Sequence, residues 1–247
     1  MRYTDGMALV FEQLFDPESS TYTYLVGDSD AKVAALIDPV AEQVERDLGR
    51  VAAHGLRLVH TIETHVHADH VTGGGALSER TGSKPVVHRD SPVTCEAVRL
   101  GQGDRFQLGV LVFDVLETPG HTPESLSFVL AGDGGARVFT GDALLIGTCG
   151  RTDFQGGDAG ALYDSIHGRL FALPDETVVY PAHDYQGQTS STIGAERRRN
   201  TRVVANGVSR SRDEFITLMN GLGLPPPKKL DVALPANLGC GRPPQSH

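Results

Sequence analysis

The chain has 247 residues, a formal net charge of −9 and 39% hydrophobic residues, which is enough for one large globular domain or two small ones with a well-formed core. It holds no apolar run of about 18 residues, which argues against a membrane-spanning helix, and its first residues lack the basic and apolar regions of a signal peptide. The acidic balance argues against nucleic acid as a partner, and we expect a cytoplasmic protein that binds neither nucleic acid nor membrane.

The first half of the sequence predicts three strands and a helix, followed by further strands and helices. Alternating apolar residues between Asp-Pro and Gly-Asp turns indicate the strands. Apolar residues at helical spacing, with Gly55 as a C-cap, indicate the first helix. The expected strands are 9–15, 21–26, 33–37, 56–64 and 85–88. The expected helices are 40–54, a segment that runs to Arg80 before Gly82, and 91–99.

The second half predicts a β-rich block, then a helix and a last strand. The expected strands are 106–108, 110–117, 125–130, 137–140 and 177–180, with an amphipathic helix over 158–173. Two mixed sheets packed face to face, with helices outside, would cover both faces of each sheet. We therefore predict an α/β (α+β) fold in a single domain over 1–247. The triple-proline run 225–227 leads into a short C-terminal tail from about residue 225.

The three cysteines, Cys95, Cys149 and Cys240, are far apart in the sequence and form no Cys-x-x-Cys motif. Their odd number and wide spacing predict a reducing compartment and no disulfide framework. We interpret Cys149 and Cys240 as buried free thiols rather than catalytic groups.

The densest group of polar residues lies directly after the predicted strand 56–64 and comprises His65, His67, Asp69 and His70. Residues i and i+2 of an extended segment point the same way, so His65 and His67 can face one ion. The alternative is a polar loop with scattered histidines, but this pattern arises by chance in roughly one chain in a thousand of this length. The group therefore predicts a metal site.

Three later residues repeat this context, because each follows a β-rich segment and precedes a turn: His121, Asp142 and His183. In layered α/β folds, functional residues gather where loops leave one edge of the sheets. We therefore expect these three side chains to join the first group at one site.

Six sequence motifs stand out: IETHVHADHVTG (62–73), GHTPES (120–125), TGDALLI (140–146), CGRTDFQ (149–155), YPAHDY (180–185) and PANLGCG (235–241). Together they resemble the persulfide dioxygenase family of the metallo-β-lactamase superfamily, whose mark is HxHxDH followed by separated His, Asp and His. The resemblance extends from Leu9 to about Gly241. The resemblance implies a four-layer αββα sandwich with the site at one edge of the sheets.

Within that family, the resemblance implies one Fe(II) per chain, bound by His65, His121 and Asp142. Two imidazoles and one carboxylate leave three positions open on Fe(II), enough for a substrate sulfur and O₂ together. The remaining ligand-type residues would surround these three: His67, Asp69, His70 and His183. Residue spacing alone leaves a dinuclear site open, because ligands for two metal ions are present.

The implied reaction oxidises glutathione persulfide with O₂ and water to sulfite and glutathione. Because glutathione carries two carboxylates, its pocket should offer cations and hydroxyls, and we expect Arg151 and Tyr185 to bind it. Family analogy also suggests a homodimer and an upstream rhodanese or sulfide oxidase that makes the persulfide.

The main alternative is a glyoxalase II-like dinuclear metal hydrolase of glutathione thioesters. The complete set of seven ligand-type residues favours it, whereas the motifs at 150–155 and 235–241 oppose it. Such hydrolases usually carry a helical C-terminal extension, and few residues follow His183 here. A non-catalytic binding protein on the same fold would be expected to have lost ligands, and none is missing.

Overall fold

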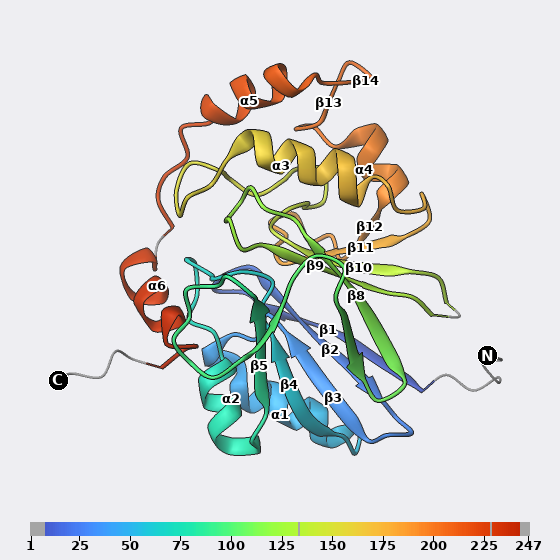
Figure 1. Cartoon of the computed structure of the whole chain (residues 1–247), viewed down its shortest axis with the longest axis vertical. Coiled ribbons are helices and arrows are strands. Elements are labelled where there is room, and N and C mark those ends of the chain that lie inside the picture. The colour runs from blue at the N-terminus through green and yellow to red at the C-terminus, as the bar shows by residue number, and fades with distance from the viewer. Residues whose placement is uncertain (1–7, 133, 228, 243–247) are drawn as a thin grey trace.

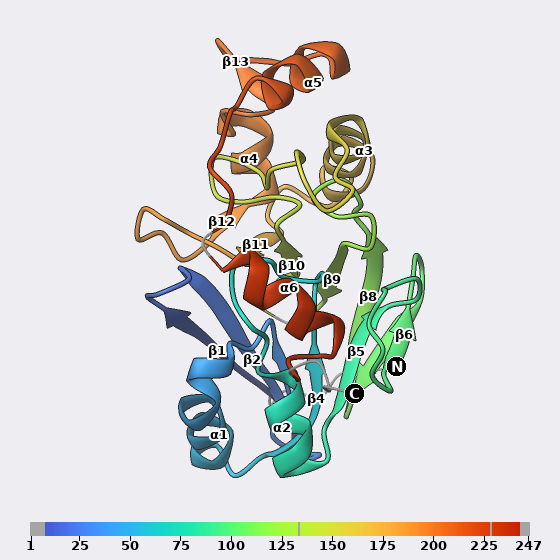
Figure 2. The ribbon, with the colours of Figure 1, turned by 90° about the vertical axis from the view of Figure 1, so that its left-hand side faces the viewer.

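The computed structural model describes residues 8–132, 134–227 and 229–242. Within them, two six-stranded sheets lie face to face, and helices cover the outer side of each sheet (Figure 1). The view turned by 90° shows the same order of layers (Figure 2). Both sheets are mixed, so the predicted fold class, a four-layer αββα sandwich, is confirmed.

The first sheet is antiparallel from β1 to β3 and parallel from β3 to β6. Its strands, in spatial order, are β1 (Leu9–Asp16), β2 (Thr21–Asp28), β3 (Val33–Ile37), β4 (Arg57–Ile62), β5 (Lys84–His88) and β6 (Val98–Leu100). A 3-10 turn at Ala41–Gln43 leads into α1 (Val44–Ala53), and α2 (Gly74–Thr81) follows β4. The apolar faces of both helices pack on the outer face of this sheet, where Val51 and Leu77 are buried.

The second sheet has the order β12, β11, β10, β9, β8, β7. Its strands are β7 (Arg105–Leu108), β8 (Leu111–Glu117), β9 (Leu126–Leu130), β10 (Arg137–Gly141), β11 (Val178–Pro181) and β12 (Ser191–Thr192). A small hairpin joins β13 (Val204–Ala205) and β14 (Val208–Ser209). The outer helices are α3 (Ala159–Ser165), which continues into a π-helical turn at Ile166–Leu170, α4 (Ile193–Arg199) and α5 (Arg212–Asn220).

The core between the sheets is built from large aromatic side chains. Tyr24 from the first sheet packs against Phe139 from the second at 5.1 Å between centroids, and Phe113 links Phe139 to Phe128. All four side chains are less than 2% exposed. Burial of each such ring removes a large apolar area from water and stabilises the stack by about 2–3 kcal/mol. This core fixes the distance between the two sheet edges that carry the polar loops.

The segment that follows the prolines at 225–227 contains a helix, α6 (Leu230–Leu238), which lies across the edge of the sandwich (Figure 2). Its last carbonyl, at Leu238, accepts a hydrogen bond from the backbone N–H of Thr94 at 2.8 Å. None of the helices in the described ranges is long and apolar enough to cross a bilayer.

Two local predictions are wrong. Residues 91–97 form an irregular loop instead of a helix, because the Arg99 guanidinium donates to the carbonyls of Arg89, Ser91 and Val93. The second error concerns Cys240, which forms a disulfide with Cys95 and is not a free thiol. The two cysteines are 145 residues apart in the sequence, and only the docking of the C-terminal segment brings their Cα atoms to 6.1 Å.

Candidate metal centre

The polar loops meet because the strands before them end at the same edge. β3, β4 and β5 are parallel to one another, so their carboxyl ends lie together in the first sheet. β8 and β10 are both antiparallel to β9, and β11 is parallel to β10, so these three also end together in the second sheet. Hydrogen bonds from Leu126 N–H to the Thr64 carbonyl and from Tyr22 N–H to the Ala182 carbonyl join the sheets there.

The first group of candidate ligands comprises His65, His121 and Asp142, each of which offers a ligand atom within 4.8 Å of the others. The His121 Nδ1 lies 2.7 Å from the carbonyl oxygen of Arg151, and donation of its proton there leaves Nε2 free to face the group. Among the described residues, the buried Asp142 Oδ1 has no hydrogen-bond partner. Burial lowers the pKa of His65 well below its ordinary value, which keeps its imidazole neutral and able to bind a metal.

The second group comprises His67, Asp69 and His183. Asp69 Oδ2 lies 3.0 Å from Nδ1 of His70 and 3.5 Å from Nε2 of His183. Burial alone would raise the pKa of Asp69, but these two imidazoles hold it well below its ordinary value. The hydroxyl of Thr21 on β2 lies within 3.5 Å of Asp69, His70 and His183, which links the loop to the first sheet.

His67 also belongs to a third group, with Asp38 and Glu63, and does not share a group with His65. Its Nε2 lies 3.1 Å from Asp38 Oδ1 and 3.6 Å from Glu63 Oε2. Burial by itself would lower the pKa of His67, but the Asp38 carboxylate raises it to about 10. The rings of His65 and His67 lie 4.1 Å apart between centroids, so the expectation that they can face one ion stays a prediction.

Sequence reasoning did not identify Asp38, Glu63 or Glu124 as part of the site. Asp38 accepts from both the backbone N–H and the hydroxyl of Thr64 at 2.8 Å. Glu124 accepts from the backbone N–H of Val66 at 3.0 Å. A signal for Asp38 was present, because it too is an acidic residue at the end of an apolar strand and before a turn.

Two glycines let the ligand loops approach each other. Gly141 has a φ of +53°, and a Cβ there would lie 2.6 Å from the Thr64 Oγ1. A Cβ at Gly150 would lie 2.3 Å from the carbonyl oxygen of Asp142 and 3.0 Å from the His121 Nδ1. Any side chain at these positions would push two ligand loops apart.

The two predicted substrate contacts differ in their surroundings. The Arg151 guanidinium donates to Asp153 at 2.7 Å and to the Leu224 carbonyl at 3.0 Å, and it stacks over the ring of Phe154. Tyr185 is 71% exposed, and its ring lies parallel to that of His183 at 6.0 Å between centroids. Tyr185 thus borders the metal centre with a free face, whereas Arg151 is engaged within the loops.

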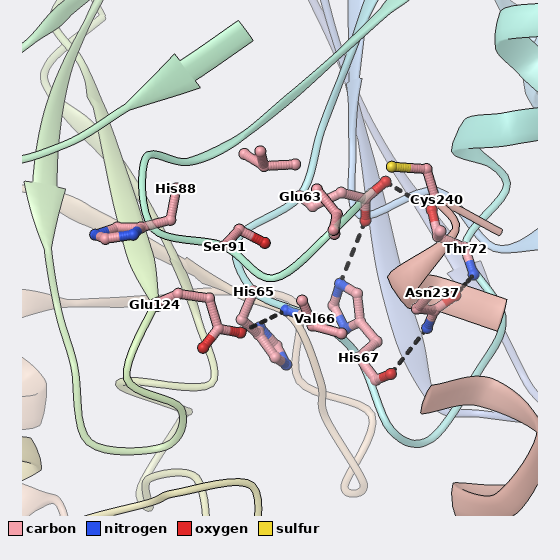
Figure 3. A pocket seen from close by; sticks show the side chains of 12 residues that line it. Glu63, His65, Val66, His67, Thr72, His88, Ser91, Glu124, Asn237 and Cys240 are labelled. Carbon is pink, nitrogen blue, oxygen red and sulfur yellow. Dashed lines mark hydrogen bonds and ion pairs between the residues drawn. The ribbon is translucent and has the colours of Figure 1, made fainter. Parts of the chain in front are cut away.

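Behind His65 and His67 lies a cavity of about 20 Å³, lined by Glu63, Glu124 and Cys240 among others (Figure 3). A volume of about 10–15 Å³ is enough to hold one water molecule when polar groups surround it. Burial raises the pKa of Glu63 to about 7. The cavity therefore lies between the metal motif and the C-terminal segment, and its lining combines buried carboxylates with the valines Val66, Val87 and Val93.

The donor set of the first group limits the chemistry of the site. Two imidazoles and one carboxylate on one side of an ion are typical of non-haem Fe(II) centres with open positions. Ligands for a second ion are also at hand in His67, Asp69 and His183, and the buried Nδ1 of His67 has no hydrogen-bond partner among the described residues. The donor groups therefore fit either one ion or two.

Comparison with known proteins gives a family match over residues 16–183, to the metallo-beta-lactamase superfamily. The mouse protein named persulfide dioxygenase ETHE1, mitochondrial, is 45% identical over 237 residues, which is 96% of this chain and 90% of the mouse protein. The crystal structure of ETHE1 from Myxococcus xanthus has a TM-score of 0.89 and 53% identity, and covers 94% of this chain and 100% of that chain.

A hydrolase relative matches less of the chain. The hydroxyacylglutathione hydrolase of Synechococcus is 37% identical over 172 residues, which is 66% of this chain and 64% of the hydrolase. Both the identity and the shared length are therefore higher for the relatives named persulfide dioxygenase.

Proposed function

The chain belongs to the persulfide dioxygenase family of the metallo-β-lactamase superfamily, and from this premise we propose that it oxidises glutathione persulfide with O₂ and water to sulfite and glutathione at one ferrous iron. It is an oxidoreductase, a persulfide dioxygenase. Glutathione as the carrier of the persulfide, iron as the metal and the roles of single residues belong to the proposal.

Iron fits the residues of the first group. His65, His121 and Asp142 supply the two imidazoles and one carboxylate that Fe(II) oxygenases use. The unpartnered Asp142 Oδ1, buried among the described residues, would gain a partner on metal binding. Ferrous iron held there would supply the electron transfer and O₂ chemistry that side chains alone lack.

We take a single iron per chain from the resemblance to the persulfide dioxygenases, and this number stays a prediction. The Nε2 of His67 is engaged by Asp38, whereas its buried Nδ1 has no hydrogen-bond partner among the described residues and lies beside Asp69. We assign His67, Asp69, His70 and His183 to the surroundings of the iron, where they orient ligands and the substrate sulfur. Loss of such a residue typically costs about 10- to 100-fold in metal affinity or activity.

The chain's own residues would also bind and shield the substrate. The exposed Tyr185 stands beside His183 and is our candidate for a hydrogen bond to glutathione. Arg151 is the second candidate, but its donors are engaged by Asp153 and loop carbonyls, so its contact with glutathione stays a prediction. Phe154 packs edge-on against His121 at 6.0 Å between centroids and limits the access of water to that ligand.

The test is oxygen uptake by Fe(II)-loaded protein given glutathione persulfide, with sulfite measured in the same sample. We expect uptake matched by sulfite, and loss of both in His121→Ala. His54→Ala serves as the control, because His54 caps the C-terminal end of α1 and contacts Glu12 on the surface. Absence of uptake by iron-replete protein would overturn the proposal.

The alternative activity, hydrolysis of glutathione thioesters, rests on the retained second group of ligands. Zinc-loaded protein that hydrolyses S-lactoylglutathione, while the iron-loaded protein takes up no oxygen, would establish the hydrolase instead. The homodimer, the upstream rhodanese or sulfide oxidase and the cytoplasmic location stay predictions.

A further inference from the structure

One side chain of the C-terminal helix holds the backbone of the metal-ligand loop. Asn237, near the end of α6, is 3% exposed. Its Oδ1 accepts from the backbone N–H of Thr72 at 2.9 Å, and its Nδ2 donates to the carbonyls of His67 and His70, both at 2.8 Å. Figure 3 shows its side chain pointing from α6 toward this loop.

We propose that Asn237 is a positioning residue for the metal centre, which acts by fixing the loop that carries His65, His67, Asp69 and His70. The inference deepens the proposed function, because it rests on the metal site placed at this loop. It does not depend on which substrate the site accepts.

The loop needs such a partner because it has no regular secondary structure between Ile62 and Gly74. Buried backbone N–H and C=O groups are paired almost without exception in folded proteins. Here three of these groups, at His67, His70 and Thr72, are paired by a single amide. Without it, the loop would have to rearrange or leave buried polar groups unpaired, at a cost of about 1–3 kcal/mol for each.

Asn237 is itself held in place by its surroundings. The carbonyl of Leu238 accepts from the backbone and the hydroxyl of Thr94, and Cys240 is linked to Cys95. At Gly241 a Cβ would lie 2.2 Å from the carbonyl oxygen of Thr72, so the chain after α6 lies directly on the loop. The hydrogen bonds of Thr94 and the disulfide therefore fix the position of the Asn237 amide relative to the loop.

The chemistry of the three bonds requires an amide. One oxygen must accept while one nitrogen donates twice, and of the side chains of this size only asparagine does both. In Asn237→Asp the shape is kept, but a carboxylate oxygen would face the carbonyl oxygens of His67 and His70. In Asn237→Ala all three bonds are lost.

The test compares iron retention in Asn237→Asp, Asn237→Ala and Val51→Ala. Val51 lies in α1, and its side chain is buried against the outer face of the first sheet. Its replacement by alanine therefore lowers the stability of the fold and leaves the ligand loops unchanged. The Fe(II)-loaded proteins are mixed with a chelator, and the rate of iron loss is followed together with the melting temperature. The electron paramagnetic resonance spectrum of the nitric oxide adduct reports the geometry of the iron.

We expect both Asn237 variants to lose iron about 10- to 100-fold faster than the unmodified protein, with an altered spectrum. Val51→Ala should lose iron at the same rate as the unmodified protein, even if its melting temperature falls as much as that of the Asn237 variants. Unchanged iron loss in both Asn237 variants would overturn the proposal, as would equally fast loss in Val51→Ala.

Hydrogen exchange of the unmodified protein adds a measurement that needs no variant. The proposal requires slow exchange at the amide of Thr72, and rapid exchange there would overturn it. Iron retention and hydrogen exchange are measured without catalytic turnover. Failure of the oxygen-uptake assay alone would therefore count against the proposed function and not against the role of Asn237.

Discussion

The Nε2 of His67 lies 3.1 Å from Oδ1 of Asp38, so an imidazole of the metal motif contacts a carboxylate at the end of the neighbouring strand β3. Both side chains are 1% exposed. Asp38 has a φ of +50°, an unusual backbone conformation for a residue other than glycine. Strain of this kind persists where the surrounding contacts over-determine it, and here the contacts to Thr64 and His67 do so.

Asp38→Asn should destabilise the metal-free protein in a pH-dependent way. The pKa of His67 is raised from 6.5 to about 10, so its contribution to stability is complete below about pH 6.5 and is lost as the pH rises to about 10. We expect the variant to lose roughly 3–5 kcal/mol at pH 6, because it removes the carboxylate nearest to a buried imidazolium. Urea unfolding at pH 6, 8 and 10 measures the free energy of unfolding of both proteins. A difference between them that stays constant with pH would contradict the prediction.

Gly150→Ala should impair the metal centre. The new Cβ would lie 2.3 Å from the Asp142 carbonyl oxygen, and a displacement of about 1 Å at a reacting centre can cost about 100-fold in rate. Oxygen uptake and iron content measure the effect. Gly49→Ala is the matched control, because a Cβ at Gly49 in α1 meets nothing within 4 Å and alanine favours the helix. Equal losses in both variants would count against the packing argument.

Tyr185→Phe should raise the KM for glutathione persulfide about 3- to 10-fold and leave kcat unchanged, because it removes one hydrogen bond to the bound substrate. Steady-state kinetics give the two constants separately. Tyr163→Phe provides the control, since that hydroxyl donates to the Arg210 carbonyl, away from the metal centre. A fall in kcat alone would place Tyr185 in the chemistry instead of in binding.

Cys95→Ser should lower the free energy of unfolding by roughly 2–4 kcal/mol, because the Cys95–Cys240 disulfide closes a long loop of the chain. Unfolding by urea with and without dithiothreitol measures the effect. The reductant should destabilise the unmodified protein and leave the variant unchanged. Equal stability of the unmodified protein in both buffers would show that the bond contributes nothing.

Cys149 should resist alkylation in the native protein, because its thiol is buried and burial raises its pKa to about 12. Iodoacetamide at pH 8, followed by mass spectrometry, should leave the folded protein unmodified and add one label after unfolding. Two further labels should appear only after reduction. Labelling of native Cys149 would contradict its buried position.

Much of this protein could be predicted from the sequence. The strands at 33–37 and 137–140 could be predicted because they are short apolar runs bounded by turn residues, which is a local property. The gathering of His65, His121 and Asp142 could be predicted because carboxyl ends of parallel strands share an edge, whatever the exact packing. The strands follow from residues close together in the chain, and the gathering of the ligands follows from a general rule of sheet architecture.

Only the tertiary structure decided which partner each polar group meets. The Nε2 of His67 contacts Asp38, which lies 29 positions earlier in the chain and which no local pattern pairs with it. The sequence predicts neither the bond between Cys95 and Cys240 nor the contact of Asn237 with the ligand loop. Both depend on the packing of α6 against that loop. These contacts join residues more than 25 positions apart, and their formation depends on the balance of burial and hydrogen bonding across the whole fold, which local pattern does not encode.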